Sequence, residues 1–91
     1  MKAETIMEKL DQNKFIKGTV RVFDKDKSGS ALQLVLQTDE FEKLIIDNTI
    51  SSEGLFFLVN EEVIIKGNKY VVLHDSLLHI IVDSFEMTET I

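Results

Sequence analysis

The sequence predicts an α+β fold, in which two short helices pack on a mostly antiparallel, curved sheet or a small open β-barrel. Three observations indicate this class. Two segments carry apolar residues at helical spacing, two others alternate with period two, and the chain after Leu55 is dense in β-branched residues. The expected order of elements is α-β-β-α-β-β-β-β, within one domain of residues 1–91.

The first helix is expected near the start of the sequence. Four apolar residues there fall at i, i+3, i+4 and i+7, which places them on one stripe of a helix over about residues 3–11. A helix this short is marginal in isolation, so it is expected to dock on the sheet. The stripe consists of Ala3, Ile6, Met7 and Leu10.

Two strands and a connecting loop are expected next. Residues 15–23, FIKGTVRVF, alternate with period two and place Lys17 and Arg21 on the same face of a half-buried strand. Residues 24–30, DKDKSGS, have the composition of a polar loop. Residues 31–37, ALQLVLQ, complete a hairpin as its second strand.

A second helix is expected over residues 38–47, TDEFEKLIID. Asp39 and Glu42 have the spacing of a capping box, and acidic residues in a first turn favour the positive end of the helix dipole. The helix is expected to end by Asn48, before a polar loop. Its buried stripe would consist of Phe41, Leu44 and Ile45.

The segment from Glu61 to His74, EEVIIKGNKYVVLH, predicts a β-hairpin with a two-residue turn at Gly67-Asn68. Glycine suits such a turn because it reaches positive φ without steric cost. Both faces of this hairpin are apolar, so a helix, a second layer of sheet or another copy of the chain is expected to cover each face. The candidate interface residues are Val63, Ile65, Tyr70 and Val72.

Further strands are expected on either side of that hairpin. Leu55–Val59 is interpreted as the third strand and Leu77–Phe85 as the sixth. The alternative to the sixth strand is a C-terminal helix capped by Ser76, because four apolar residues there also have helical spacing. Glu86–Ile91 is expected to be a frayed tail. The four residues of the helical alternative are Leu78, Ile81, Val82 and Phe85.

Charge is unevenly distributed along the chain. The net charge is -6, with a net +2 in residues 1–37 and a net −8 in residues 38–91. The acidic half would repel phosphate backbones, so direct nucleic-acid binding is not expected. An acidic surface would attract a basic protein surface, although a solubilising face gives the same pattern.

Composition also bears on the compartment. The sequence has no cysteine, which excludes a disulfide framework, a thiolate metal site and a cysteine nucleophile. The first residues carry no apolar signal core. The longest unbroken apolar run, Leu55–Val59, is far shorter than the roughly 20 residues that span a bilayer. A cytoplasmic protein without membrane association is therefore expected.

The predicted loop over residues 24–30 resembles the first half of a calcium-binding loop of the EF-hand family, D-x-D-x-[DNS]-G. The resemblance implies Asp24, Asp26 and Ser28 as side-chain ligands of Ca²⁺ and Ser30 as a backbone ligand. Position twelve of such a loop holds a bidentate glutamate, whereas Val35 stands here. The alternative interpretation is a hairpin loop of good turn formers without a metal.

Little else in the sequence indicates catalysis. His74 and His79 suggest a metal or acid–base pair, but a metal site needs about three protein ligands, and structural histidines are the simpler interpretation. No nucleophile motif and no glycine-rich phosphate loop is present. The expectation is a non-enzymatic protein without a cofactor.

Three functional hypotheses follow. The first is a small interaction protein that associates with itself or with a protein partner. The second is a protein that binds a small anionic, nucleotide-like ligand at a subunit interface. The third is an acidic charge mimic that inhibits a basic nucleic-acid-binding partner, a role for which small acidic accessory proteins of bacteria and phages offer a compositional parallel. The cations available to the anionic ligand are Lys17, Arg21, Lys25 and Lys27.

Overall fold

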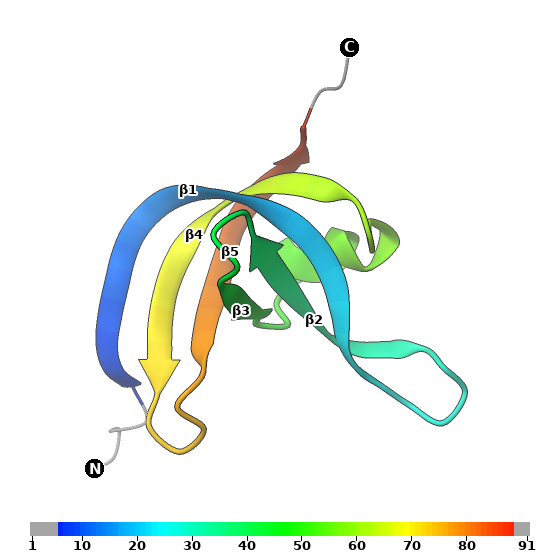
Figure 1. Ribbon diagram of the computed structural model, residues 1–91, viewed down its shortest axis with the longest axis horizontal. Helices are drawn as coiled ribbons and strands as arrows, with labels where there is room; N and C mark the ends of the chain where they lie inside the picture. Colours follow the sequence, from blue (N-terminus) through cyan, green and yellow to red (C-terminus); the bar gives the residue numbers. More distant parts are fainter. Residues whose placement is uncertain (1–5, 89–91) are drawn as a thin grey trace.

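The computed structural model describes the backbone of residues 6–88 and the side chains of residues 15–88. Its strands form a closed barrel in the order β1-β2-β3-β5-β4 (Figure 1). The predicted α+β class with an open sheet and two helices is therefore wrong, because almost every element is a strand of one closed barrel. The elements are β1 (Ile6–Lys25), β2 (Ala31–Thr38), β3 (Lys43–Ile46), the 3₁₀-helix η1 (Ile50–Phe57), β4 (Glu62–Val72) and β5 (Leu78–Met87).

All strand pairs are antiparallel except β3 with β5, which is parallel. The long β1 pairs with β4 along its first part and with β2 along its second, and Gly18 pairs with both strands. A Cβ atom at Gly18 would lie 2.6 Å from the backbone oxygen of Gln37, so this crossing point requires glycine. The strand order, with its helix between β3 and β4, is that of the OB-fold, a five-stranded Greek-key barrel.

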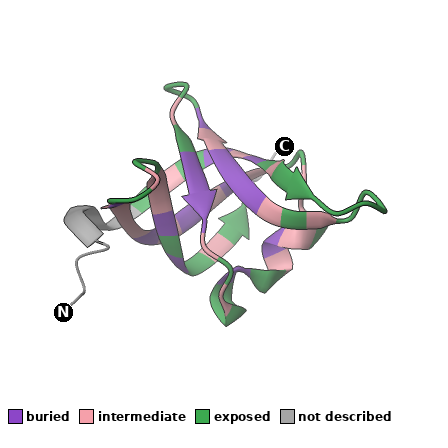
Figure 2. Cartoon of the chain, turned by 90° about the horizontal axis from the view of Figure 1, so that it is seen from below, coloured by how far each residue is buried: buried purple, intermediate pink, exposed green. Residues whose placement is uncertain are grey.

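The barrel interior is filled by aliphatic side chains from the strands and by Leu55 from η1, which is fully buried among them. The 3₁₀-helix closes one end of the barrel, where the ring of Phe85 packs against Gly54. Figure 2 shows buried positions alternating with exposed ones along the strands. The strand residues of this core are Val20, Leu34, Leu36, Leu44, Ile46, Val63, Ile65, Ile80 and Val82.

The predicted first helix is wrong over its described part. From Ile6 the backbone is extended, and Ile6, Lys9 and Leu10 pair with Val72, Tyr70 and Lys69 of β4. A short helix gains little from its own hydrogen bonds, whereas β4 offers a continuous row of backbone partners. Ala3 of the predicted stripe lies outside the described residues.

The predicted helix over residues 38–47 is also wrong. A tight turn follows Thr38, and β3 begins at Lys43. Leu44 and Ile46 point into the core and Ile45 points outward, which is the period of a strand. The acidic residues at positions 39, 40 and 42 mark the turn rather than a helix start.

The expected turn at Gly67-Asn68 is wrong, because both residues lie within β4. Gly67 is required for a different reason: a Cβ atom there would lie 2.3 Å from the backbone oxygen of Ile81. The strands β4 and β5 approach each other too closely at this point for any side chain. Of the two apolar faces of β4, one lines the barrel and the other is half-buried on the outside.

The remaining sequence predictions divide into two groups. The expected strand Leu55–Val59 is wrong, because the 3₁₀-helix occupies most of it. The strands over 15–23, 31–37 and 77–85 are confirmed, so the alternative C-terminal helix is wrong. Of the expected frayed tail, Glu86 and Met87 belong to β5, and residues 89–91 lie outside the described part.

No helix within the described residues is long and apolar enough to cross a membrane.

Candidate interaction site

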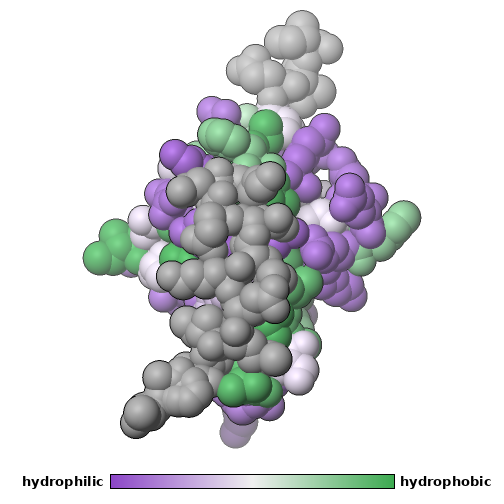
Figure 3. All heavy atoms as spheres, turned by 90° about the vertical axis from the view of Figure 1, so that its left-hand side faces the viewer, coloured by the Kyte–Doolittle hydropathy of each residue, from purple (hydrophilic) through white to green (hydrophobic). Residues whose placement is uncertain are grey.

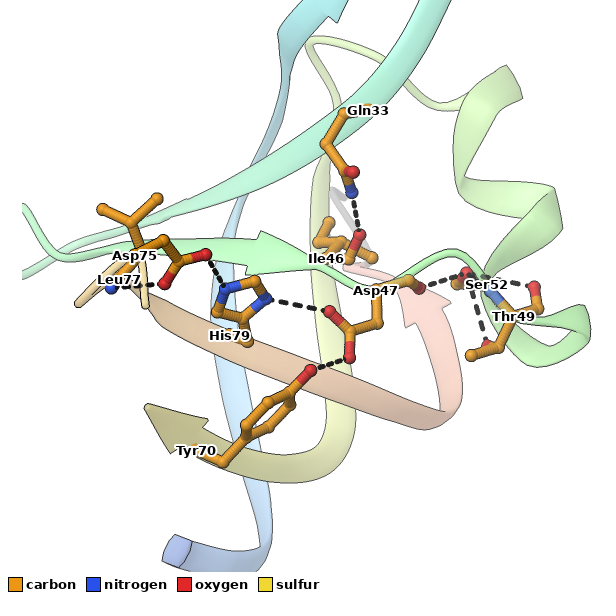
Figure 4. A network of polar contacts seen from close by, with 9 residues as sticks. All are labelled: Gln33, Ile46, Asp47, Thr49, Ser52, Tyr70, Asp75, Leu77 and His79. Atoms are coloured by element: carbon orange, nitrogen blue, oxygen red, sulfur yellow. Dashed lines mark hydrogen bonds and ion pairs between the residues drawn. The ribbon is translucent and has the colours of Figure 1, made fainter. Parts of the chain in front are cut away.

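A polar cluster on the outside of the barrel is centred on Asp47, directly after β3 (Figure 4). Its backbone nitrogen donates to the oxygen of Ile80 at 3.0 Å, and its backbone oxygen accepts from Ser52 Oγ at 2.8 Å. The carboxylate accepts a hydrogen bond from the Tyr70 hydroxyl and lies 3.0 Å from Nδ1 of His79. Asp47 therefore joins η1, β4 and β5 to the end of β3.

The imidazole of His79 lies between two carboxylates, because its Nε2 is 3.0 Å from Oδ2 of Asp75. Carboxylates only accept, so both contacts are hydrogen bonds only when the ring carries both protons. Partial burial lowers the pKa of His79, but the hydrogen bonds to Asp47 and Asp75 outweigh burial and raise it above 6.5. The Tyr70 ring stacks on the imidazole, with 5.1 Å between centroids.

The pKa values of Asp75 and Tyr70 are shifted in opposite directions. The backbone hydrogen bond from Leu77 and the contact with His79 lower the pKa of Asp75. Burial and the hydrogen bond to Asp47 raise the pKa of Tyr70, so its hydroxyl keeps its proton. Around neutral pH, Tyr70 is therefore neutral and Asp75 is ionised, and the contacts of His79 favour its charged form.

OB-folds bind ligands on the outer side of β2 and β3 and at the adjoining loops, and this cluster borders that face at the end of β3 and in the β4–β5 loop. Across that face Arg21 pairs with Val35, Val35 with Ile45, and Ile45 with His79. Val35 and Ile45 point outward yet are 5% and 7% exposed. The carboxylates of Asp47 and Asp75 lie beside them and would repel a phosphate backbone. The face is thus largely occupied by the chain's own contacts.

Phe15 of β1 lies between two shallow grooves of about 340 Å³ each, and its side chain is 70% exposed. One groove, here called the acidic groove, runs between β1 and the β2–β3 turn. The other runs over β4 and β5, where Lys66 Nζ lies 6.0 Å from the Phe15 ring centroid. The charged and aromatic residues that line the acidic groove are Phe15, Lys17, Asp39, Glu40, Glu42 and Lys69.

The β2–β3 turn holds the acidic rim of this groove in place. Thr38 Oγ1 accepts from the backbone nitrogens of Glu40 and Glu42 at 3.3 and 3.2 Å. Lys69 Nζ lies 3.0 Å from Glu42 Oε1, which ties the turn to β4. Within the described chain, the side chains of Asp39 and Glu40 form no hydrogen bond or ion pair. Two carboxylates at the rim are therefore available to a partner.

A second exposed feature is the β1–β2 arm, defined as residues 23–32, which projects away from the barrel (Figures 1 and 2). Asp26 Oδ1 accepts from Ser28 N at 2.9 Å, Ser28 Oγ at 2.7 Å and Ser30 N at 2.9 Å. The Ser28 hydroxyl and the Ser30 backbone hydrogen bond lower the pKa of Asp26. The loop is thus closed by its own hydrogen bonds.

The candidate calcium ligands Asp24, Asp26 and Ser28 all lie in this arm and are exposed. One oxygen of Asp26 already accepts three hydrogen bonds from the loop itself. No group of three or more histidine, aspartate or glutamate side chains suited to a metal occurs among the described residues. His74, the other histidine considered, is exposed in the β4–β5 loop.

The four cations proposed for an anionic ligand are not brought together. Lys17 lies at the acidic groove, 4.0 Å from Glu62 Oε2, and Arg21 donates to Asn60 Oδ1 at 2.7 Å. Lys25 and Lys27 lie in the arm, at the opposite end of the β1–β2 pair. The shared face of Lys17 and Arg21 is confirmed, because both point outward from β1.

The candidate interface residues divide between core and cluster. Val63 and Ile65 are 0% exposed in the barrel core, so no partner contacts them without opening the barrel. Val72 is 8% exposed, and Tyr70 belongs to the polar cluster. The sequence interpretation missed Phe15, although one signal was present: this aromatic residue stands on the polar face of its strand, beside Lys17.

Comparisons with known proteins give no further guidance, because no protein-family model, no curated protein and no solved structure matches this chain.

Proposed function

We propose that this chain is a non-enzymatic interaction protein that associates with itself. The observation that carries the proposal is Phe15, a large aromatic side chain that is 70% exposed between two grooves. Exposed apolar side chains are common singly, but an aromatic ring between concave surfaces offers a partner both apolar area and shape. Figure 3 shows hydrophobic and hydrophilic side chains interspersed on the described part of one face of the molecule.

Two competing classes of function, nucleic-acid binding and catalysis, have less support. The OB-fold often binds oligonucleotides, but fold does not imply function, and here Asp47 and Asp75 border the face concerned. Catalysis at the polar cluster would require an uncommitted acid or base. Instead, both ring nitrogens of His79 and the hydroxyl of Tyr70 are bound to carboxylates. A cytoplasmic location belongs to the same proposal.

The two alternative binding hypotheses differ in their support. A small anionic ligand would need several converging cations, whereas Lys17 lies far along β1 from Lys25 and Lys27. A basic partner protein has more support, because the acidic groove offers Asp39 and Glu40 beside an aromatic ring. Cations bind favourably over aromatic faces and next to carboxylates. The hypothesis of a basic partner uses the same surface as self-association and differs only in which molecule occupies it.

The test is sedimentation velocity of the full chain over a wide range of concentrations near physiological salt. The weight-average mass is expected to rise reversibly with concentration. Phe15→Ser should weaken association about tenfold or more, because burying a phenylalanine stabilises a contact by roughly 1.5–3 kcal/mol. Phe57→Ser is the matched control, since Phe57 is 88% exposed on η1, away from both grooves. A strictly monomeric wild type at every concentration would disprove self-association.

A further inference from the structure

We infer that the acidic groove binds the β1–β2 arm of a second copy of this chain. The inference rests on the proposed self-association and specifies the two surfaces that meet. The alternatives for the same groove are a basic segment of a different protein and no macromolecule at all, and the experiment below separates these from the second copy.

The arm has the chemistry of an inserting element. Lys25 and Lys27 are exposed in it, and within the described chain neither forms an ion pair. At its base, Phe23 and Leu32 are 53% and 49% exposed, so apolar area accompanies the two charges. The three hydrogen bonds to Asp26 Oδ1 fix the loop in advance, which lowers the entropic cost of docking.

The groove complements the arm both in charge and in exposed apolar area. Its rim carries Asp39 and Glu40, two carboxylates without partners in the described chain. Apolar contact is available from Phe15, and Phe41 projects beside the two carboxylates with 85% of its side chain exposed. Two uncommitted ammonium groups thus match two uncommitted carboxylates, and exposed apolar side chains accompany both pairs.

The topology prevents one chain from satisfying itself. Lys25 and Lys27 of the arm precede β2 and the acidic rim follows it, so the eight residues of this strand separate the two sets of charges. Eight residues of extended strand span about 23 Å between the first and last Cα atoms, and β2 is held in the barrel on both sides. The arm therefore reaches a groove only on another copy. Such a contact either is reciprocal, which gives a closed two-fold dimer, or continues head to tail into a ring or an open chain.

Net charge does not prevent this contact. Two copies of charge -6 repel each other at long range. Near physiological salt the Debye length is about 8 Å, so this general repulsion is largely screened while pairs in contact are retained. The arm as a whole is neutral, because Asp24 and Asp26 balance Lys25 and Lys27. The local pairing of its two lysines with the acidic rim then determines which surfaces meet.

The experiment uses two charge-reversed full-length chains in sedimentation velocity. The arm variant is Lys25→Glu with Lys27→Glu, and the groove variant is Asp39→Lys with Glu40→Lys. Each alone should associate at least about tenfold more weakly than the wild type, because like charges then face each other. An equimolar mixture of the two should recover association, since each altered surface meets its opposite in the other chain. A chain with all four reversals should also recover it.

The control for the groove variant is Glu53→Lys with Asp83→Lys, the same change of charge at two exposed positions on η1 and β5. It should leave association within about twofold of the wild type. Thermal melts of every variant exclude misfolding as the cause of a loss. If the wild type associates and the arm variant associates equally well, the arm inference is wrong while self-association stands. If the wild type is monomeric and labelled octalysine binds it instead, a different basic protein occupies the groove, and both proposals are wrong.

Discussion

Nδ1 of His79 lies 3.0 Å from Oδ1 of Asp47, and this contact connects the two parallel strands of the barrel. The β3–β5 pair contains only two register pairs, Ile45 with His79 and Ile46 with Ile80, so it is the shortest pairing in the closed sheet. Parallel pairing is also slightly less stable per residue than antiparallel pairing. The polar cluster therefore reinforces the barrel where its backbone hydrogen bonding is least extensive.

Stability should depend on pH through this cluster. The pKa of His79 is raised in the folded state, so its stabilising effect is complete below the ordinary value of 6.5 and is lost as the pH rises through the raised pKa. The pKa of Asp75 is lowered, so its effect is present above 3.8 and is lost as the pH falls further. The cluster should stabilise the fold most between these values. Melting temperatures are expected to fall as the pH is raised from about 6 to about 9.

The control for this pH dependence is His79→Gln, which keeps hydrogen-bonding capacity but does not titrate. Its melting temperature should be lower than that of the wild type near pH 6 and should change less as the pH rises. Asp47 from the end of β3, Tyr70 from β4 and Asp75 from the β4–β5 loop face the ring. All three groups remain in the variant, but Asp75 loses the part of its lowered pKa that comes from His79. An unchanged slope in His79→Gln would show that other groups cause the dependence.

Gly67→Ala should destabilise the barrel by about 2 kcal/mol or more, because the added Cβ would meet the backbone oxygen of Ile81 at 2.3 Å and a backbone atom cannot rotate away. Gly54→Ala is a matched comparison, since its Cβ would meet the outer end of the Phe85 ring at 2.9 Å. A ring can shift, so the cost there should be smaller. Urea denaturation measures both, and equal costs would contradict the close approach of β4 and β5.

How far the sequence predicts this fold depends on whether a local pattern has one meaning. The period-two segments FIKGTVRVF and ALQLVLQ are strands, as predicted, because no helix places their apolar residues on one face. Other segments are ambiguous. As short local patterns, the stripe Ala3–Leu10 and the segment 38–47 fit a helix as well as they fit a strand. Closure of the barrel determines which conformation these segments adopt, and that closure depends on pairings between residues distant in sequence.

The candidate site was less predictable than the strands. A glycine next to an asparagine is the usual signal of a tight turn, and nothing local reveals that Gly67 makes room for another strand. The cluster around Asp47 joins positions 47, 70, 75 and 79, which the sequence could have linked only with the register of β4 and β5 known. Lys17 and Arg21 were correctly placed on one face, because that prediction needs only the alternation of a single strand.

Leu55→Ala should lower the free energy of unfolding by about 3 kcal/mol, since Leu55 is fully buried where η1 closes the barrel. Phe57→Ala, two residues further along the same helix, should change it by less than about 0.5 kcal/mol, because that ring is 88% exposed. Equilibrium unfolding in urea gives both values. Similar losses at the two positions would mean that η1 does not seal the core through Leu55.

Phe41 has a φ of 65°, a left-handed backbone conformation that side chains with a Cβ atom disfavour. Phe41→Gly should therefore be more stable than Phe41→Ala by about 1 kcal/mol, because both remove the exposed ring and only glycine relieves the backbone. The opposite order is expected at Phe57, which lies in η1 without positive φ, where glycine should be about 0.5 kcal/mol less stable than alanine. Urea denaturation of the four variants measures both differences. If alanine were the more stable residue at position 41, the turn that presents Asp39 and Glu40 would not be held in this conformation in solution.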